Sequence, residues 1–229
     1  MQCICNECTA TVTLVPSPVK PPLTYRQEQA AATRTRIASA ARRLFGVSGY
    51  QMTSVAVIAA EAGVAERTVY AAYGAKREIL SAICDAWLEE AHARELVQAA
   101  VGETDPERTV ALAARFLRSL FETGFDVMVL FEAASAEDPE TKAMLRAKLE
   151  GRNHVQNLIV ESIRDHIVIP VGAAQAIYRA LAAVGVYQEL VVESGWSIDA
   201  YEQWILGQLR TQLLGRPPAD PEDRPAAPS

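Results

Sequence analysis

The sequence predicts an all-α protein with two domains, and three observations support this. Half of the 229 residues are apolar, which is enough to bury a sizeable core in one or two domains. Alanine, leucine, glutamate and arginine dominate the middle of the chain, and most prolines stand near its two ends. Between those ends, apolar residues recur at the spacing of helix faces. We therefore expect helices throughout the middle of the chain.

The two ends do not have this pattern. Residues 1–24 contain four prolines and no helical periodicity, and residues 216–229 are rich in proline and acidic, so we expect a disordered arm and a disordered tail. Cys3, Cys5 and Cys8 are spaced like a metal knuckle, but a closed zinc site needs four ligands and no fourth lies near. We interpret this stretch as an unstructured leader and expect no metal.

The first helix is predicted over about 33–47, and Ser48-Gly49-Tyr50 ends it. A second helix follows at about 54–62, with Thr53 or Ser54 as its N-cap, because a hydroxyl can accept from the free amides of a first turn. Gly63 suits the left-handed turn that follows a helix.

A third short helix is predicted over 66–73, and Gly74 ends it. Two short helices joined by a tight turn containing glycine are typical of a helix-turn-helix motif. The second helix of the motif needs only one buried edge, which here is Val69 with Val64 and Ala72. The small side chains of Ala71 and Ala72 keep it slim enough for a major groove about 12 Å wide.

The remaining segments read as a series of amphipathic helices. Asp105-Pro106 and Asp138-Pro139 each place an N-cap residue before a proline at the first helical position. The predicted ranges are 76–101, 106–123, 125–136, 139–167, 172–194 and 199–214. The last two look like a hairpin whose apolar content exceeds what one small domain needs inside; its members are Val184, Val186, Leu190, Val191, Trp204, Leu206, Leu209 and Leu213.

The charge is distributed unevenly along the chain. The net charge is −6, yet residues 24–81 carry eight basic side chains and four acidic ones. A basic segment joined to an acidic one suggests that only the first contacts a polyanion. No apolar run is long enough for a membrane span, and we find no signal peptide, so we expect a cytoplasmic protein that contacts no membrane.

Residues 34–80, "RTRIASAARRLFGVSGYQMTSVAVIAAEAGVAERTVYAAYGAKREIL", closely resemble the DNA-binding domain of the TetR (tetracycline-repressor) family of bacterial regulators. The matching positions are Ile37, Ala40, Ala41, Leu44, Phe45, Gly49, Tyr50, Thr53, Val55, Ile58, Ala59, Ala62, Gly63, Val64, Thr68, Tyr70, Tyr73, Lys76 and Leu80. The sequence departs from the family at Ala65 and Ala75, where N-cap residues are usual, and at Glu66, which brings negative charge near phosphates.

The resemblance implies a three-helix N-terminal helix-turn-helix DNA-binding domain, followed by a helical ligand-binding and dimerisation domain. It implies a homodimer formed through residues 172–214, a palindromic operator in double-stranded DNA, and a repressor released by a small effector. We place the DNA-binding domain at 31–91, with its motif at about 54–73, and the second domain at 92–215.

Within the DNA-binding domain, Arg67 and Thr68 open the third helix and are expected to read base edges. Lys76 is expected to contact phosphate from the first turn of the fourth helix. Thr53 either caps a helix only or also contacts phosphate, and Tyr73 either only packs or also places its hydroxyl at the DNA backbone. The full set of expected DNA-contacting residues is Thr53, Ser54, Arg67, Thr68, Tyr70, Ala71, Tyr73 and Lys76.

The effector pocket is expected among the helices after residue 100, although aromatic and methionine stripes of this kind are more often plain core. Its expected lining is Phe116, Leu120, Phe121, Phe125, Met128, Phe131, Leu145, Leu149 and Tyr178. This lining suggests a small, largely apolar effector. We expect no cofactor, and the three histidines are too scattered for a metal site.

Two other classes of function fit the sequence less well. A helical carboxylate enzyme would use residues such as Glu132, Glu137 and Asp138, but they lack the Glu-x-x-His spacing of helical metal-carboxylate sites. A structural DNA binder without a ligand gives no reason for a second domain of this size. We therefore expect a regulator and not an enzyme.

Overall fold

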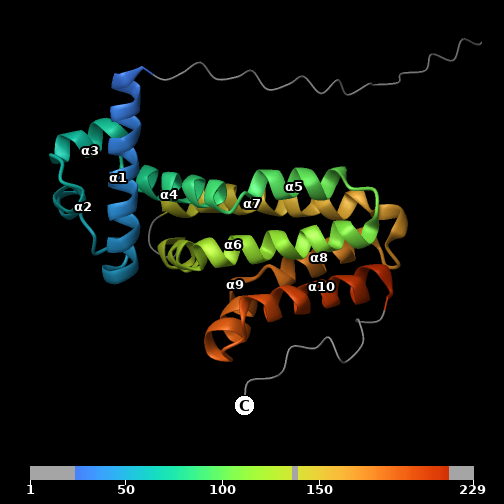
Figure 1. Cartoon of the computed structure of the whole chain (residues 1–229). Coiled ribbons are helices and arrows are strands. Elements are labelled where there is room, and N and C mark those ends of the chain that lie inside the picture. Colours follow the sequence, from blue (N-terminus) through green and yellow to red (C-terminus); the bar gives the residue numbers. More distant parts are fainter. Residues whose placement is uncertain (1–23, 136–138, 217–229) are drawn as a thin grey trace, which may run out of the picture.

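Every element that the structure describes is a helix, which confirms the predicted fold class (Figure 1). The structure is a computed structural model and describes residues 24–135 and 139–216. Its α-helices are α1 (Tyr25–Ser48), α2 (Val55–Glu61), α3 (Glu66–Tyr73), α4 (Lys76–Glu90), α5 (Ala93–Gly102), α6 (Pro106–Ser135), α7 (Pro139–Ser162), α8 (Val171–Leu181), α9 (Val184–Tyr187) and α10 (Ile198–Leu214). A 3₁₀ turn (Arg164–His166) follows α7, and a π-helix (Gln188–Glu193) follows α9.

The helices form two groups that meet at α1. Figure 1 shows α1 standing across the ends of the longer helices, with α2 and α3 on its far side and α4 leading away from it. A single cluster of buried apolar residues runs through both groups, from Ile37 on α1 to Leu214 on α10. No helix within the described ranges is long and apolar enough to cross a membrane.

The first helix begins earlier than the sequence predicts. The predicted start near residue 33 is wrong, because α1 begins at Tyr25 behind a capping box: the Thr24 hydroxyl accepts from the Gln27 amide, and the Gln27 side chain accepts from the Thr24 amide. The segment has no apolar periodicity, so only the cap could have revealed it. Residues 1–23 and 217–229, where we expected the arm and the tail, lie outside the described residues.

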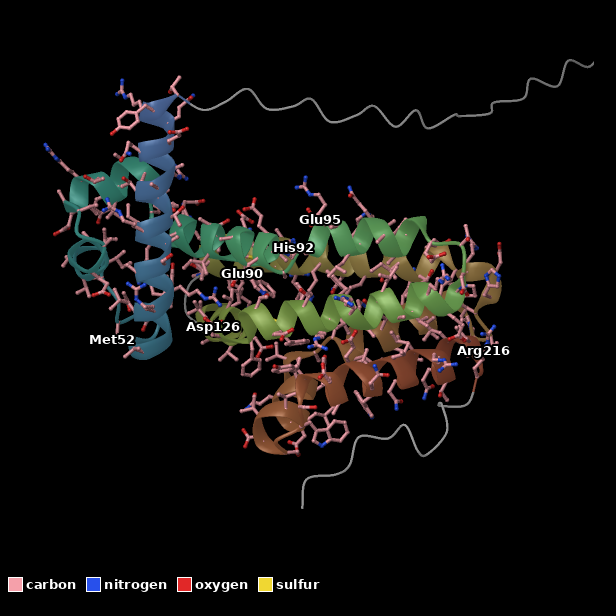
Figure 2. The ribbon with its side chains drawn as sticks, in the orientation of Figure 1. Met52, Glu90, His92, Glu95, Asp126 and Arg216 are labelled. Carbon is pink, nitrogen blue, oxygen red and sulfur yellow. The ribbon has the colours of Figure 1, made fainter. Side chains whose placement is uncertain are left out.

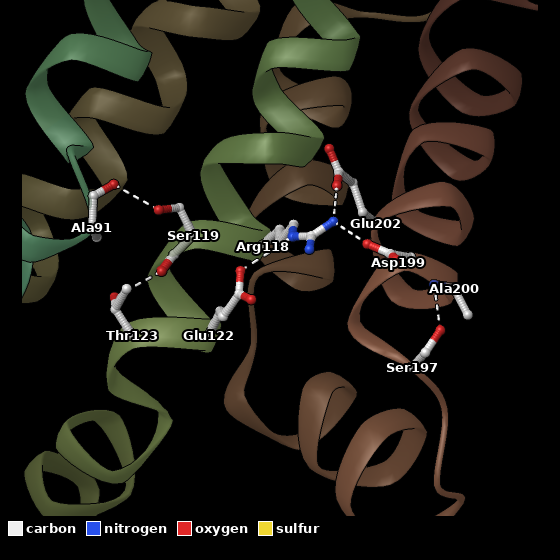
Figure 3. A network of polar contacts seen from close by, with 9 residues as sticks. All are labelled: Ala91, Arg118, Ser119, Glu122, Thr123, Ser197, Asp199, Ala200 and Glu202. Atoms are coloured by element: carbon white, nitrogen blue, oxygen red, sulfur yellow. Dashed lines mark hydrogen bonds and ion pairs between the residues drawn. The ribbon is translucent and has the colours of Figure 1, made fainter.

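A single helix over 76–101 is also a wrong prediction, since α4 ends at Glu90 and α5 starts at Ala93. The break lies at His92, which adopts a left-handed conformation with φ of 48°. The Ser119 hydroxyl of α6 donates to the carbonyl of Ala91 at 2.7 Å (Figure 3). The predicted boundary between the two domains falls at this break.

The two helices predicted over 106–123 and 125–136 form the two segments of α6, which meet at a kink where Gly124 has non-helical backbone angles. The sequence therefore located this interruption. The indole N–H of Trp87 on α4 donates to the Leu120 carbonyl, one turn before the kink, at 2.9 Å. A Cβ on Gly124 would stand 2.2 Å from the Trp87 ring, so the kink and the indole fit together only when residue 124 has no side chain.

Arg42 on α1 holds the other side of the kink. Its guanidinium donates to both Asp126 carboxylate oxygens, at 2.7 and 2.6 Å, and to the Thr123 carbonyl at 2.9 Å. Glu90 on α4 lies 3.6 Å from the same group, and Figure 2 labels both carboxylates where α1 meets α4 and α6. Burial opposes ionisation of Asp126, but the hydrogen bond and charge of Arg42 outweigh it and lower the pKa of that carboxyl.

The middle of α6 is tied to α10 by Arg118. Its guanidinium contacts Glu122 on α6 and both Asp199 and Glu202 on α10 (Figure 3). The predicted helix over 139–167 ends at Ser162, and the one over 172–194 breaks at Ala182 before continuing as α9 and the π-helix. Both predictions therefore overestimated the length of the regular helix.

The Gly124 kink gives a stability prediction. Gly124→Ala should destabilise the protein by about 1–3 kcal/mol, since the new methyl group overlaps the Trp87 ring in a packed interior. Urea unfolding followed by circular dichroism measures this free energy.

Gly151→Ala is the matched control. Gly151 is a helical glycine of α7 with open space around its Cβ direction, so alanine there should be neutral or stabilise by up to about 1 kcal/mol. Equal stability of the two variants would show that Trp87 does not require glycine at 124.

Candidate nucleic-acid interface

α2 and α3 pack against α1 around a small apolar core. Ile58 of α2 and Val69 of α3 are essentially fully buried, and Ala59 and Ala62 lie beside them. The turn between the helices passes through Gly63 with φ of 65°, and the Val64 amide donates to the Ala59 carbonyl at 3.0 Å. This left-handed turn is the one the sequence predicts, and it fixes the direction in which α3 leaves α2.

The N-cap of α2 is Ser54 and not Thr53. The Ser54 hydroxyl accepts from the Val57 amide at 3.3 Å. Thr53 is 2% exposed, and its hydroxyl donates to the Gly49 carbonyl at 2.8 Å, within the loop that joins α1 to α2. Of the two residues named for this position, Ser54 therefore lies at the surface and Thr53 stabilises the loop.

The buried edge of α3 consists of Val69 and Tyr73. The Tyr73 hydroxyl donates to the Arg34 carbonyl of α1 at 2.8 Å, and the Arg34 guanidinium lies 4.6 Å from the centre of the Tyr73 ring. Burial raises the pKa of the Tyr73 hydroxyl. The ring is buried as expected, but the hydroxyl is bonded inside the protein, where it fixes the end of α3 on α1.

The remaining faces of α3 are open. Arg67 and Ala71 are exposed, Tyr70 is 52% exposed, and Thr68 is half-buried. Within the described part of the chain, the Arg67 side chain has no hydrogen bond or ion pair. The helix therefore presents a free guanidinium, a phenol and small alanines, a surface able to donate hydrogen bonds in a groove.

Lys76 is more deeply engaged than the sequence indicates. Its ammonium group donates to the carbonyls of Tyr50, Gln51 and Thr53, at 2.7, 3.4 and 3.2 Å. It also lies 4.3 Å from the centre of the Tyr50 ring. The phosphate contact stays a prediction, because the structure uses this cation to tie the start of α4 to the α1–α2 loop.

Neither α3 nor α4 has a side-chain N-cap. Ala65 and Ala75 occupy those positions, and neither makes a capping hydrogen bond. The first amides of both helices are therefore not capped by a side chain at the N-cap position.

The predicted effector-pocket residues lie mostly in the interior of the second domain, but Leu149 is 46% exposed. A small void of about 10 Å³ lies in this domain, and of the predicted lining only Tyr178 reaches it. The other residues around this void come from α6, from α7 and the residue that follows it, and from α10: Thr109, Val110, Ala113, Ile159, Val160, Ile163, Leu209 and Leu213. A larger surface groove of about 340 Å³ is lined by Glu103, Arg108, Ala111, Leu112, Arg115 and Glu202.

The sequence interpretation missed the buried polar groups of this domain. Gln156 on α7 is 0% exposed, and within the described residues neither end of its amide has a hydrogen-bond partner. The Tyr201 hydroxyl on α10 is buried in the same way. Gln156 shares the face of α7 that carries Ile159 and Val160, so the apolar period of α7 was the available signal.

Other expectations concern metal ligands and thiols. Within residues 24–135 and 139–216, no group of three or more His, Cys, Asp or Glu could hold a metal ion. Cys3, Cys5, Cys8, Glu137 and Asp138 lie outside those residues. Cys84 is a free thiol, and burial raises its pKa to about 11, which keeps it protonated and unreactive at neutral pH.

Comparison with known proteins assigns the N-terminal unit. Residues 37–83, from the middle of α1 into α4, match the sequence model of the N-terminal domain of "Bacterial regulatory proteins, tetR family". Comparison with curated proteins gives no significant match.

Solved structures with a similar fold include the regulator FadR of Bacillus subtilis in complex with stearoyl-CoA. It is 19% identical, with a TM-score of 0.62, over 76% of this chain and 96% of that chain. A Saccharomonospora viridis structure in complex with choline is 17% identical, with a TM-score of 0.64, over 81% of this chain and all of that one. NalD, the secondary repressor of the MexAB-OprM efflux pump in Pseudomonas aeruginosa, is 21% identical, with a TM-score of 0.61, over 82% and 98%. At these identities the likeness concerns the fold alone.

The contacts of Lys76 give a prediction about stability. Lys76→Ala should cost about 1–3 kcal/mol of unfolding free energy, since three carbonyls of the α1–α2 loop lose their donor. Urea unfolding measures the loss. Arg67→Ala, which removes a cation without partners from the adjacent helix, should change stability by no more than about 0.5 kcal/mol. If both variants unfold alike, the three hydrogen bonds contribute nothing.

Proposed function

We propose that this chain, a member of the tetR family of bacterial regulatory proteins through its N-terminal domain, is a repressor that binds a palindromic operator as a homodimer and is released by a small effector. The observation that carries the proposal is the exposed face of α3, which is held by a helix-turn-helix and carries the unpaired Arg67 guanidinium.

Residues on this face divide into those that read sequence and those that position the protein. Arg67 and Thr68 stand in the first turn of α3, where a helix in the major groove meets base edges. Tyr70 and Ala71 follow on its exposed side. Ser54, at the exposed start of α2, would donate to phosphate.

Three more of the residues expected to contact DNA, Thr53, Tyr73 and Lys76, stabilise the structure of the domain. Thr53 and Lys76 hold the α1–α2 loop, and Tyr73 fixes α3 on α1. Lys76 is the first residue of α4, whose N-terminus has no side-chain cap, and this supports a phosphate contact there in addition to the carbonyl partners of Lys76.

The dimer surface is assigned to residues 172–214. Val184, Leu209 and Leu213, which we counted as surplus apolar residues, are buried in this chain's own core. The apolar surface that remains includes Val192, which is 52% exposed, and the edge-to-face pair of Trp196 and Trp204. Such a surface supports pairing with a second copy, because a two-fold dimer covers the same patch on both subunits.

The effector is assigned to the second domain, among α6, α7, α8 and α10. The residues around the small void are apolar apart from Thr109 and Tyr178, which supports a largely apolar ligand. Gln156 does not line this void but lies one turn before Ile159 and Val160, which do, and its unpartnered amide supports a hydrogen-bonding group on that ligand as well. The two ligands in the similar structures, choline and stearoyl-CoA, differ so much that the fold does not determine the ligand.

The kink in α6 supports coupling between the effector and DNA. α4 carries Trp87 into the kink and begins at Lys76, which holds the α1–α2 loop, while Arg42 joins α1 to the same kink. An effector that shifts α6 would therefore move both helices that support α2 and α3. By linkage, DNA must weaken effector binding by the same factor.

The proposed recognition of DNA bases by Arg67 and Thr68 gives the first test. Arg67→Ala and Thr68→Ala should each cost about 1–3 kcal/mol per half-site on the preferred operator and less on a scrambled duplex. The operator is first selected from random duplexes, and its half-site centres should lie about 34–36 Å apart or a multiple of this. Binding isotherms on both duplexes measure the difference. Equal losses on both would mean that these side chains position the protein without reading sequence.

The dimer gives the second test. Wild type should sediment as a two-subunit species at micromolar concentration, and Trp204→Arg should shift it to monomer, because a buried unpaired charge is costly at an interface. Leu158→Arg on α7 is the matched control, since Leu158 is 42% exposed and lies outside the hairpin. A Trp204→Arg variant that remains a dimer would remove this surface from the interface.

A further inference from the structure

The first half of α1 projects beyond the rest of the protein. From Tyr25 to Arg36 every residue is exposed except Thr33, which is half-buried, and the first fully buried residue of α1 is Ile37. At 1.5 Å per residue this segment, the α1 extension (Tyr25–Arg36), is about 18 Å long. Figure 1 shows the N-terminal end of α1 standing past α3.

An extension of this kind buries little apolar surface within its own chain. A short helix that is polar all round is marginal in water by itself, so its capping box and the continuous helix behind it must hold it in shape.

The extension has two chemically different faces. Arg26 precedes Ile37 by eleven residues, so the two side chains point within about 20° of each other around the helix. Ile37 marks the side of α1 that is buried in the core. Arg34, which contacts the end of α3, precedes Ile37 by three residues and lies about 60° from it, on this same side. Glu28 precedes Ile37 by nine residues and lies about 180° away. Arg26 is therefore on the side of α1 that carries the contact with α3, and Glu28 is on the opposite side.

The extension meets the end of α3 at Arg34. The Arg34 guanidinium donates to the Ala72 carbonyl near the end of α3, at 2.5 Å, so the extension lies next to the proposed recognition helix. Within the described residues, Arg26 and Arg36 have no hydrogen bond or ion pair. Both guanidinium groups are free to bind an anion.

We propose that the α1 extension is a second DNA-contacting element, in which Arg26 binds phosphates of the duplex flanking the segment that α3 occupies. The proposal rests on the proposed binding of DNA by α3. Duplex DNA fits this face because its phosphates form a continuous row of anions, and because the extension lies next to α3. Its contribution is to affinity and footprint, since phosphate contacts carry no sequence information directly.

The experiment measures salt dependence with the full chain. Wild type, Arg26→Ala and the control Arg94→Ala are titrated with a random duplex of about 40 base pairs at several salt concentrations, because each phosphate contact adds about 0.9 to the slope of log K against log salt. Arg94 is an exposed arginine of α5 without a partner in the described chain, so both variants remove one free cation per subunit. Arg26→Ala should lower the slope by about 0.9 per subunit bound, and Arg94→Ala should leave it unchanged.

Duplex length supplies a second arm. Trimming the duplex to the segment covered by α3 should abolish the difference between wild type and Arg26→Ala, because the flanking phosphates are gone. If wild type binds and Arg26→Ala has the slope of Arg94→Ala on the long duplex, the α1 extension does not contact DNA. If wild type itself fails to bind any duplex, the proposed function fails instead. Circular dichroism of each variant checks that its helix content is retained.

Discussion

The contact on which the structure most depends is the insertion of Trp87 into the kink of α6. Gly124 interrupts the regular helix, and the indole N–H of Trp87 donates to the Leu120 carbonyl at 2.9 Å. The ring occupies the space that a side chain at 124 would fill. The kink at Gly124 therefore has a structural role, because it makes the space in which the Trp87 ring of α4 packs.

Both α1 and α4, which support the N-terminal unit, contact α6 at the Gly124 kink. α4 enters it through Trp87, and α1 closes it through Arg42, which binds the Thr123 carbonyl and the Asp126 carboxylate. One buried cluster runs from α1 to α10 through this region. A change in the shape of α6 must therefore reach α1 and α4 together, which is how a ligand in the second domain would alter the position of α3.

The sequence predicted features that depend on neighbouring residues. It did not predict features that depend on contacts between segments far apart in the chain. The turn at Gly63 and the full extent of α3 were predictable, because glycine and helix spacing act within a few residues. The sequence also located the interruption at Gly124, but could not show that Trp87 of α4 packs there. The break at His92 has no local signal, and the Lys76 contacts join residues 23 to 26 positions apart. The burial of Gln156 was not predicted, because a polar side chain adds nothing to the apolar periodicity of α7.

The central claim is that Trp87, packed at the Gly124 kink, joins the N-terminal unit to the second domain. Its most direct test is native-state hydrogen exchange of wild type and Trp87→Phe, a change that keeps an aromatic ring and removes the indole N–H. In wild type, the amides of α1 beyond Ile37 and those of α6 around Gly124 should exchange with the same opening free energy, because the two helices open together. In Trp87→Phe, the α1 amides should open separately and at lower free energy. If the α1 amides already open separately in wild type, and Trp87→Phe leaves them unchanged, then the kink of α6 does not join the N-terminal unit to the second domain.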